Sequence, residues 1–175
     1  MSSARSASRE PRVTAFIALG ANLGDPAAQI RSALCALAAL PETTLVRASS
    51  FYLNPPAGNA AQPDYVNAVA MEQTGLAPRA LLDRLLEIER EHGRVRDYPN
   101  APRTLDLDLV LYGEAAVSEP GLTVPHPRML DRAFVLVPLA EIAPDARVPG
   151  RGRVADLLPG VNASGMIKLS EAHKG

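Results

Sequence analysis

The fold of this chain is decided by Arg103-Thr104-Leu105-Asp106-Leu107-Asp108-Leu109-Val110-Leu111-Tyr112. Its leucines occupy every second position, and the positions between them hold Asp106, Asp108 and Val110. Side chains that alternate with period two stand on opposite faces of a β-strand. We therefore predict a strand whose leucines enter the core and whose two aspartates lie side by side on the other face.

The two aspartates are candidate metal ligands. Neighbouring side chains on one face of a strand are about 7 Å apart, a separation at which two carboxylates repel each other but can share hard cations. Magnesium is usually held by one or two carboxylates together with waters and substrate phosphates. Arg103, just before the strand, could bind a phosphate through two parallel hydrogen bonds from its guanidinium group. The spacing leaves one alternative open, the solvated acidic face of an edge strand.

The composition indicates a single soluble domain with no global attraction for polyanions. A chain of 175 residues fits one domain, and its 18 basic and 19 acidic side chains give a net charge of −1, too small to attract nucleic acid or a membrane. The single cysteine, Cys35, can form no internal disulfide, and no apolar run is long enough to cross a bilayer. We expect a cytoplasmic monomer with a disordered tail over residues 1–12.

The order of the predicted elements indicates an α+β fold. Apolar runs predict strands over residues 13–19, 45–53 and 65–72, and Pro26 and Pro78 open two amphipathic helices. With the aspartate strand, this is the order of a ferredoxin-like βαββαβ sandwich, an antiparallel sheet with helices on one face. The other face of the sheet is expected to stay uncovered, and it could carry Asp106, Asp108, Tyr65 and Asn67.

A C-terminal helical extension is predicted beyond the sandwich. A strongly apolar stretch predicts a helix over residues 128–143, bent at Pro138. Gly150 and Gly152 predict a turn before a brief helix near residues 154–158.

The third predicted strand places Tyr65 and Asn67 on one face. Beside the long loop that follows Asn54, ring packing by the tyrosine and hydrogen bonding by the amide could recognise a flat heteroaromatic ligand. A tyrosine in a strand is more often part of the core, so both interpretations remain open.

Several charged side chains are candidates for binding phosphate or supporting a site. Glu89 falls within the apolar arc of the second predicted helix, where an ionised carboxylate needs a partner. An ion pair with an arginine of the next loop is the leading interpretation, and support of an active site is the sharper one.

The loop after that helix carries Arg94, Arg96 and Arg103 to the aspartate strand, where arginines and divalent metal could neutralise a polyphosphate. His126, held between two prolines, suits phosphate binding, although a single histidine is more often structural.

Several blocks of sequence, in chain order, carry a resemblance to a known family. They are Ile17-Ala18-Leu19-Gly20-Ala21-Asn22-Leu23-Gly24, Ser49-Ser50-Phe51-Tyr52, Pro55-Pro56, Gln62-Pro63-Asp64-Tyr65-Val66-Asn67-Ala68, Gly93-Arg94-Val95-Arg96, Pro102-Arg103-Thr104-Leu105-Asp106-Leu107-Asp108 and Leu122-Thr123-Val124-Pro125-His126-Pro127. Together they closely resemble hydroxymethyldihydropterin pyrophosphokinase of folate (tetrahydrofolate) biosynthesis. The resemblance implies transfer of the β,γ-pyrophosphoryl group of ATP to the hydroxymethyl oxygen of a reduced pterin, with release of AMP. It also implies two Mg²⁺ ions.

The resemblance further implies roles for individual residues of one catalytic domain, residues 13–175. Asp106 and Asp108 match the ligands of both metal ions and, with Arg94 and Arg103, are the expected catalytic residues. The expected ATP contacts are Glu89, Arg94, Arg96, Arg103, Thr123, His126 and Arg132. The expected pterin site comprises Asn54, Pro55, Pro56, Ala57, Tyr65, Asn67 and Phe134, with the rings of Tyr65 and Phe134 on either side of the pterin. No side-chain nucleophile is expected, because positioning and charge neutralisation dominate phosphoryl transfer.

One departure from the family and two other classes of function remain open. Pro99-Asn100-Ala101 stands where many members have Arg-Trp-Gly, so the aromatic lid of the site is either missing or supplied by Tyr98. A non-catalytic module that binds RNA or a regulatory metabolite would share the fold, but aromatic residues make up only 4% of the chain and the aspartates would repel RNA. A metal-dependent phosphohydrolase would use the same carboxylates and release phosphate without a pterin acceptor.

Overall fold

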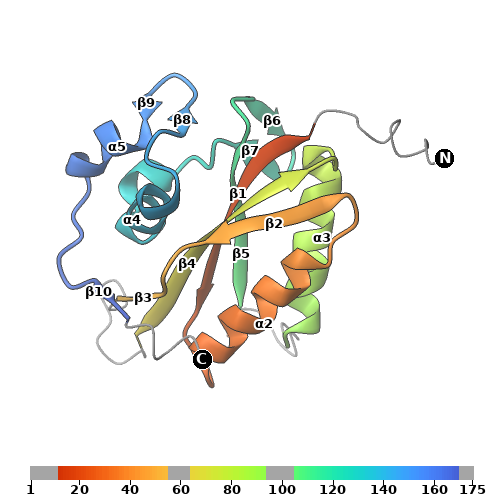
Figure 1. The fold of residues 1–175 in the computed structure, drawn as a ribbon, viewed down its shortest axis with the longest axis horizontal. Coiled ribbons are helices and arrows are strands. Elements are labelled where there is room, and N and C mark those ends of the chain that lie inside the picture. Colours follow the sequence, from red (N-terminus) through yellow and green to blue (C-terminus); the bar gives the residue numbers. More distant parts are fainter. Residues whose placement is uncertain (1–11, 55–63, 94–104, 170–175) are drawn as a thin grey trace.

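One antiparallel sheet runs through the described part of the protein (Figure 1). The computed structural model describes residues 12–54, 64–93 and 105–169. The six strands of the sheet are β1 (Val13–Ala21), β2 (Thr43–Ala48), β3 (Tyr52–Asn54), β4 (Tyr65–Thr74), β5 (Asp106–Tyr112) and β10 (Ile167–Lys168). They follow the order β10-β3-β4-β1-β5, with β2 also pairing β4, and each pairing is antiparallel. The mixed fold of helices on an antiparallel sheet is confirmed.

The strand predicted over residues 45–53 is divided into β2 and β3. Ser49 lies at the interruption, where its backbone N–H donates to the Val69 carbonyl and its Oγ accepts from the Val69 N–H, both at 2.9 Å. A serine side chain that takes a backbone position in the ladder breaks the regular pairing. The prediction of one continuous strand is therefore wrong at this serine.

Two helices cover one face of the sheet, α2 (Pro26–Ala38) and α3 (Pro78–Glu91). Asp25 caps α2 by accepting a hydrogen bond from the Ala28 N–H at 3.2 Å, and a proline stands in the first turn of each helix. The core between these helices and the sheet includes Ile17, Leu19, Ile30, Leu37, Leu81, Leu85, Leu107 and Leu109.

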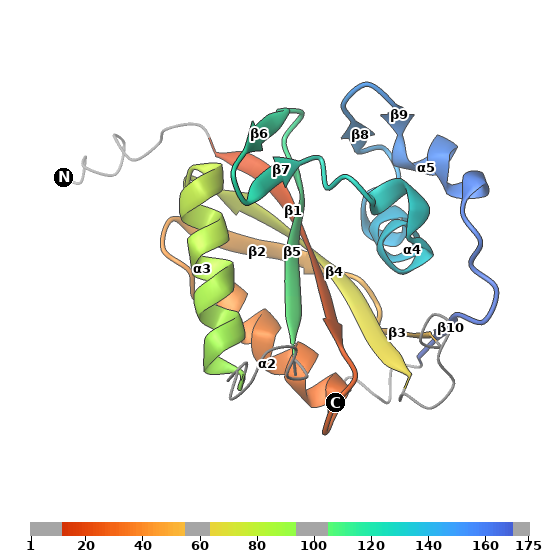
Figure 2. The ribbon, with the colours of Figure 1, turned by 180° about the vertical axis from the view of Figure 1, so that it is seen from behind.

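A third helix covers part of the second face, so the prediction of helices on one face only is wrong. The helix α4 (Ala133–Ile142) follows a 3-10 turn, η1 (Met129–Asp131), and starts later than predicted. It lies on the opposite side of the sheet from α2 and α3 (Figures 1 and 2). Its buried side chains pack with apolar sheet residues, which would otherwise remain in water. This second core includes Phe16, Ala18, Val69, Val110, Leu136 and Leu139.

A β-bulge changes the face on which Leu111 lies. Leu105, Leu107 and Leu109 belong to the core under α2 and α3, as predicted, but Leu111 belongs to the core under α4. The pairing shifts so that Ile17 stands opposite Leu109 and Phe16 opposite Leu111. The extra residue between them reverses the alternation that follows. The prediction that four leucines share a face holds for three.

The C-terminal part of the described chain consists of short elements. They are β6 (Val117–Glu119), β7 (Leu122–Val124), β8 (Arg147–Val148), β9 (Gly152–Arg153), α5 (Val154–Leu157) and η2 (Leu158–Gly160). The predicted brief helix is present as α5, and β10 then adds a strand beside β3. Among the residues described, no helix is both long and apolar enough to span a bilayer. Residues 1–11 of the predicted tail lie outside the described residues.

Glu72 is a buried carboxyl on the α2 and α3 side of β4. It is 0% exposed, it stands opposite Ala15, and neither of its oxygens has a hydrogen-bond partner among the described residues. Burial raises the pKa of Glu72 to about 7 from the ordinary value of 4.5. The folded state therefore holds this proton more tightly than the unfolded state does, and the free energy of unfolding falls as the pH rises through this window.

Replacing Glu72 by glutamine should remove that part of the pH dependence. Each pKa unit corresponds to about 1.4 kcal/mol, so the wild-type protein should lose up to about 3 kcal/mol between pH 4.5 and pH 7 that Glu72→Gln retains. Urea unfolding of both proteins across this range measures the difference, with the exposed Glu87→Gln as control. Parallel stability curves for wild type and Glu72→Gln would show that Glu72 does not titrate in this window.

Candidate active site

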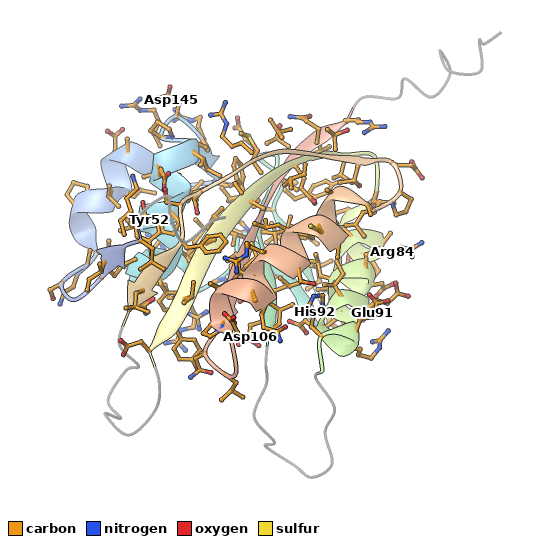
Figure 3. All side chains as sticks on the ribbon, turned by 60° about the horizontal axis from the view of Figure 1, so that its bottom comes forward. Tyr52, Arg84, Glu91, His92, Asp106 and Asp145 are labelled. Atoms are coloured by element: carbon orange, nitrogen blue, oxygen red, sulfur yellow. The ribbon has the colours of Figure 1, made fainter. Side chains whose placement is uncertain are left out.

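The predicted aspartate pair lies on the sheet face that carries α4. Asp106 stands opposite Gly20, and Asp108 stands opposite Ala18. Directly opposite residues of an antiparallel pair point to the same face. Ala18 belongs to the core under α4, so both carboxylates lie on that side, and both are half-buried. Figure 3 shows Asp106 at the lower end of the sheet, near the start of α2.

A row of residues crosses four strands at this end of the sheet. Gly20 of β1 stands between Asn67 of β4 and Asp106 of β5. Asn67 in turn stands opposite Tyr52 of β3. The face therefore presents an amide and a carboxylate on either side of a glycine, which fits the prediction that Asn67 and the aspartates share a face.

Gly20 leaves room for the Asn67 side chain. A Cβ atom at Gly20 would lie 2.8 Å from Asn67 Nδ2, closer than a real contact allows. Asn67 is 6% exposed and its Nδ2 lies 3.5 Å from the Leu19 carbonyl oxygen, so the amide lies across β1 toward β5. Sequence analysis missed this role of Gly20, because the role depends on the pairing register of β1 and β4.

Two buried amide oxygens at this face have no donor within the described part of the chain. Asn54 Oδ1 and Asn67 Oδ1 are both buried, and neither accepts a hydrogen bond from the described residues. Asn54 stands opposite Tyr65, the residue two positions before Asn67, so the three side chains lie on one face. A buried acceptor without a donor costs about 1–3 kcal/mol. Two such acceptors beside a tyrosine ring suit a flat ligand that carries N–H groups.

His126 lies beside the aspartate strand. Its backbone N–H donates to the Val110 carbonyl at 3.0 Å. Burial lowers the pKa of His126, the Asp108 carboxylate opposes this effect, and the guanidinium groups of Arg132 and Arg128 lower the pKa further. The ring Nδ1 accepts from the Arg128 N–H at 3.2 Å, so the neutral ring carries its proton on Nε2. The predicted phosphate contacts His126 and Arg132 therefore lie close together, and Asp108 is near enough for its charge to affect the His126 ring.

Arg132 and Phe134 lie together at the start of α4. The Arg132 guanidinium carbon is 5.4 Å from the centre of the Phe134 ring, within the range of a cation–π contact. Phe134 is partly buried against the core under α4. Thr123 differs, because it is exposed on β7 opposite Ser118, and among the described residues no hydrogen bond or ion pair joins it to the aspartate pair.

Glu89 is buried, as the helical pattern predicted, and binds the aspartate strand through its backbone. It is 4% exposed, and its Oε2 accepts from the Leu107 N–H at 2.7 Å. Leu107 lies between the two aspartates, so Glu89 supports the strand that carries them. The arginines predicted as ion-pair partners lie outside the described residues, and that pairing stays a prediction.

A comparison with known families decides the assignment of the chain. Residues 16–144 match the family described as 7,8-dihydro-6-hydroxymethylpterin-pyrophosphokinase (HPPK). The chain belongs to this family. A Pseudomonas aeruginosa protein named 2-amino-4-hydroxy-6-hydroxymethyldihydropteridine pyrophosphokinase is 50% identical over 157 residues, which cover 90% of this chain and 97% of that protein. A Haemophilus influenzae protein of the same name is 48% identical over 158 residues, covering 90% and 99%.

Solved HPPK-DHPS structures share the fold of this HPPK chain. One, described as HPPK-DHPS in complex with substrates, has a TM-score of 0.70 at 11% identity over 86% of this chain. Wild-type Plasmodium falciparum HPPK-DHPS has a TM-score of 0.68 at 11% identity over 87% of this chain. This chain spans 43% and 45% of those longer chains. At such low identity the likeness concerns the fold alone.

The residues of this HPPK chain fit a hard cation at the aspartate pair. Among the described residues, no group of three or more His, Cys, Asp or Glu side chains could hold a metal ion. Two carboxylates on one face are nevertheless the usual protein share of a magnesium site whose other ligands are phosphate and water. The donor set therefore suits Mg²⁺ bound together with a polyphosphate.

Several residues of the predicted HPPK site lie outside the described residues. These are Pro55, Pro56, Ala57, Arg94, Arg96 and Arg103. Residues 98–101 also lie there, so the alternatives of a missing lid and a lid supplied by Tyr98 stay predictions. A groove of about 810 Å³ is lined instead by residues at the other end of the sheet, including Arg12, Arg47 and Arg147. None of the predicted site residues lines it.

Proposed function

We propose that this HPPK chain transfers the β,γ-pyrophosphoryl group of ATP to 6-hydroxymethyl-7,8-dihydropterin in folate biosynthesis. The hydroxymethyl oxygen forms a bond to the β-phosphorus, the bond between the α- and β-phosphates breaks, and AMP leaves. Membership of the HPPK family over residues 16–144 carries this proposal. The sheet face shared by Asn67 and the aspartates supports this proposal. It places amide oxygens that have no donor among the described residues beside two carboxylates that could bind metal.

Asp106 and Asp108 would hold two Mg²⁺ ions with the triphosphate. When bound, such ions neutralise the phosphate oxygens and favour ionisation of the attacking hydroxyl. The half-burial of both aspartates supports this role, because charges attract more strongly where water is partly excluded. The hydrogen bond from Leu107 to Glu89 supports it too, since it fixes the strand between the two carboxylates.

The nucleotide would bind on the α4 side of the aspartates. His126 and Arg132 would contact the phosphates, with the His126 Nε2–H as a donor because its Nδ1 is already an acceptor. Arg94, Arg96 and Arg103 would complete the cation cluster, with Arg94 and Arg103 the expected participants in transfer. Thr123 is the remaining nucleotide contact that we propose, and its exposure makes it the weakest. Glu89 was expected to contact ATP, but it is buried on α3 on the opposite face of the sheet, so it would act on the nucleotide only through the aspartate strand that it supports.

The pterin would lie between the rings of Tyr65 and Phe134. Its N–H groups would donate to the buried oxygens of Asn54 and Asn67, which have no donor among the described residues. Aromatic stacking contributes about 0.5–1.5 kcal/mol beyond the area that it buries. The segment Pro55, Pro56 and Ala57 would close the edge of the ring.

We also place this catalytic domain, residues 13–175, in the cytoplasm as a monomer of ferredoxin-like topology. The strand order β3-β4-β1-β5, with α2 and α3 as the crossover helices, supports that topology. The helices α4 and α5 would form its C-terminal extension.

The function is tested by measuring AMP formed from ATP and Mg²⁺ with and without 6-hydroxymethyl-7,8-dihydropterin. We expect AMP only when the pterin is present, in an amount equal to the pterin diphosphate. Phosphate release that does not depend on the pterin would instead identify a metal-dependent phosphohydrolase.

Gly20→Ala should weaken pterin binding while preserving the fold. The added Cβ would force the Asn67 amide to turn away, and a flexible side-chain end yields at little cost. We expect the pterin KM to rise about tenfold and the ATP KM to stay within about twofold, as follows from the loss of one well-placed hydrogen bond. Steady-state kinetics measure both constants, with Gly160→Ala as control because nothing lies within 4 Å of its added Cβ. Equal pterin constants for Gly20→Ala and wild type would show that Gly20 does not make room for the amide.

A further inference from the structure

The carboxylate of Glu141, near the end of α4, accepts hydrogen bonds at both of its oxygens. The Ser50 N–H lies 3.0 Å from Oε1 and 3.1 Å from Oε2, and the Ser50 hydroxyl donates to Oε2 at 2.9 Å. The Tyr52 hydroxyl donates to Oε1 at 2.7 Å. All of these donors come from the junction of β2 and β3, so Glu141 joins α4 to that junction.

The same junction is fastened to β4 on its other side. Ser49 exchanges two hydrogen bonds of 2.9 Å with the backbone of Val69. Tyr52 then stands opposite Asn67, and Asn54 stands opposite Tyr65. The residues proposed to bind the pterin edge are therefore placed by a segment held between β4 and Glu141. Figure 3 shows Tyr52 on the side of the sheet that carries α4.

The helix that carries Glu141 also carries the aromatic side of the proposed slot. Phe134 and Glu141 are both on α4, seven residues apart, which is close to two full turns. Residues at this spacing lie on one face of a helix, about 10 Å apart along its axis. Rotation of α4 about its axis would therefore move the Phe134 ring and the Glu141 carboxylate together.

We propose that Glu141 is a positioning residue for the pterin slot. By holding α4 against the junction of β2 and β3, its carboxylate sets the Phe134 ring relative to the amide oxygens of Asn54 and Asn67. This inference rests on the proposed function, because the slot is the proposed pterin site. Glu141 itself touches neither substrate nor metal in this role.

An ionised carboxylate suits this role better than an amide. Burial acts to raise the pKa of Glu141, but the hydrogen bonds from Tyr52 and Ser50 and the charge of Lys168 together outweigh it, so the pKa lies below its ordinary value. Burial and the bond to Glu141 raise the pKa of Tyr52, so that hydroxyl keeps its proton. A glutamine would set its NH₂ group against one of the donors of Ser50 or Tyr52.

The test compares Glu141→Gln with wild type for pterin and nucleotide separately. Pterin fluorescence reports binding of 6-hydroxymethylpterin in the presence of a non-hydrolysable ATP analogue, and the chain contains no tryptophan to interfere. We expect the pterin Kd and KM to rise about tenfold while nucleotide affinity stays within about twofold, since the lost interaction is a charge-assisted hydrogen-bond set. Tyr52→Phe, which removes one donor, should raise the pterin Kd about threefold. The control is Glu87→Gln, an exposed carboxylate on α3 paired only with Arg84 among its described contacts.

Two results would overturn the positioning role. Unchanged pterin affinity in a folded Glu141→Gln is one, and equal weakening of pterin and nucleotide is the other, since it indicates general destabilisation. If Glu141→Gln does not fold, Tyr52→Phe decides by the same criteria. Wild-type protein that forms no AMP would overturn the proposed function and the positioning role together, whereas an active wild type with unaltered variants overturns the positioning role alone.

Discussion

Asp106→Ala and Asp108→Ala should each lower the rate of AMP formation by about a thousandfold or more. A metal ion contributes several kcal/mol to stabilising a transferring phosphoryl group, and each 1.4 kcal/mol is about a factor of ten in rate. Both side chains point to the α4 side of β5, opposite Gly20 and Ala18, where a triphosphate and its metal would lie. The loss is measured as AMP released from saturating ATP and pterin.

The fold should survive these substitutions. Both aspartates are half-buried rather than part of the core, and removing one of two like charges relieves repulsion. Circular dichroism and thermal unfolding should resemble those of Asp83→Ala, a control at an exposed position of α3. Turnover near the wild-type rate in either variant would end the metal assignment.

Asn67→Ala should weaken pterin binding by about tenfold to a hundredfold and leave ATP binding nearly unchanged. A ligand N–H left without its acceptor in a buried site costs about 1–3 kcal/mol. Asn67 is 6% exposed with an oxygen that lacks a donor among the described residues, so the pterin is the partner that we expect to lose.

The control for this prediction is Gln73→Ala, an amide on the same strand. Gln73 donates to Thr14 at the other end of β4, away from the aspartates. Titrations of the pterin and of a non-hydrolysable ATP analogue separate the two affinities for each variant. Equal losses for both ligands in Asn67→Ala would move Asn67 out of the pterin site.

The alternation of side chains made much of the site predictable. Period two along residues 105–110 places Asp106, Asp108 and Val110 together, and the same rule pairs Tyr65 with Asn67. The structure confirms these faces through the cores to which their neighbours belong. The burial of Glu89 follows equally from the helical period.

The features that sequence did not predict depend on how separate elements meet. The bulge that turns Leu111 to the other face arises from the pairing of β1 with β5. The space above Gly20 matters only because Asn67 stands opposite it. Likewise, the sequence around Ser49 predicts an ordinary strand residue, and only the structure shows that its hydroxyl oxygen accepts a hydrogen bond from the Val69 N–H. A local sequence pattern does not predict which residues of separate strands stand opposite each other.

Coverage of the second sheet face was missed for a similar reason. The helix α4 was predicted, but its own sequence does not indicate which surface of the sheet it covers. Phe16, Ala18 and Val69 supply that surface jointly from two strands. The consequence is functional, because α4 brings Arg132 and Phe134 to the face that carries the aspartates.

Divalent metal binding by Asp106 and Asp108 is measured most directly with Mn²⁺ in place of Mg²⁺. Electron paramagnetic resonance of Mn²⁺, titrated into the protein with a non-hydrolysable ATP analogue, counts bound ions without requiring turnover. We predict two protein-dependent ions for wild type and a clear loss of Mn²⁺ affinity for Asp106→Asn and Asp108→Asn, which keep the size of each side chain. Unchanged Mn²⁺ binding in both variants would contradict the assignment of these two aspartates as the metal ligands.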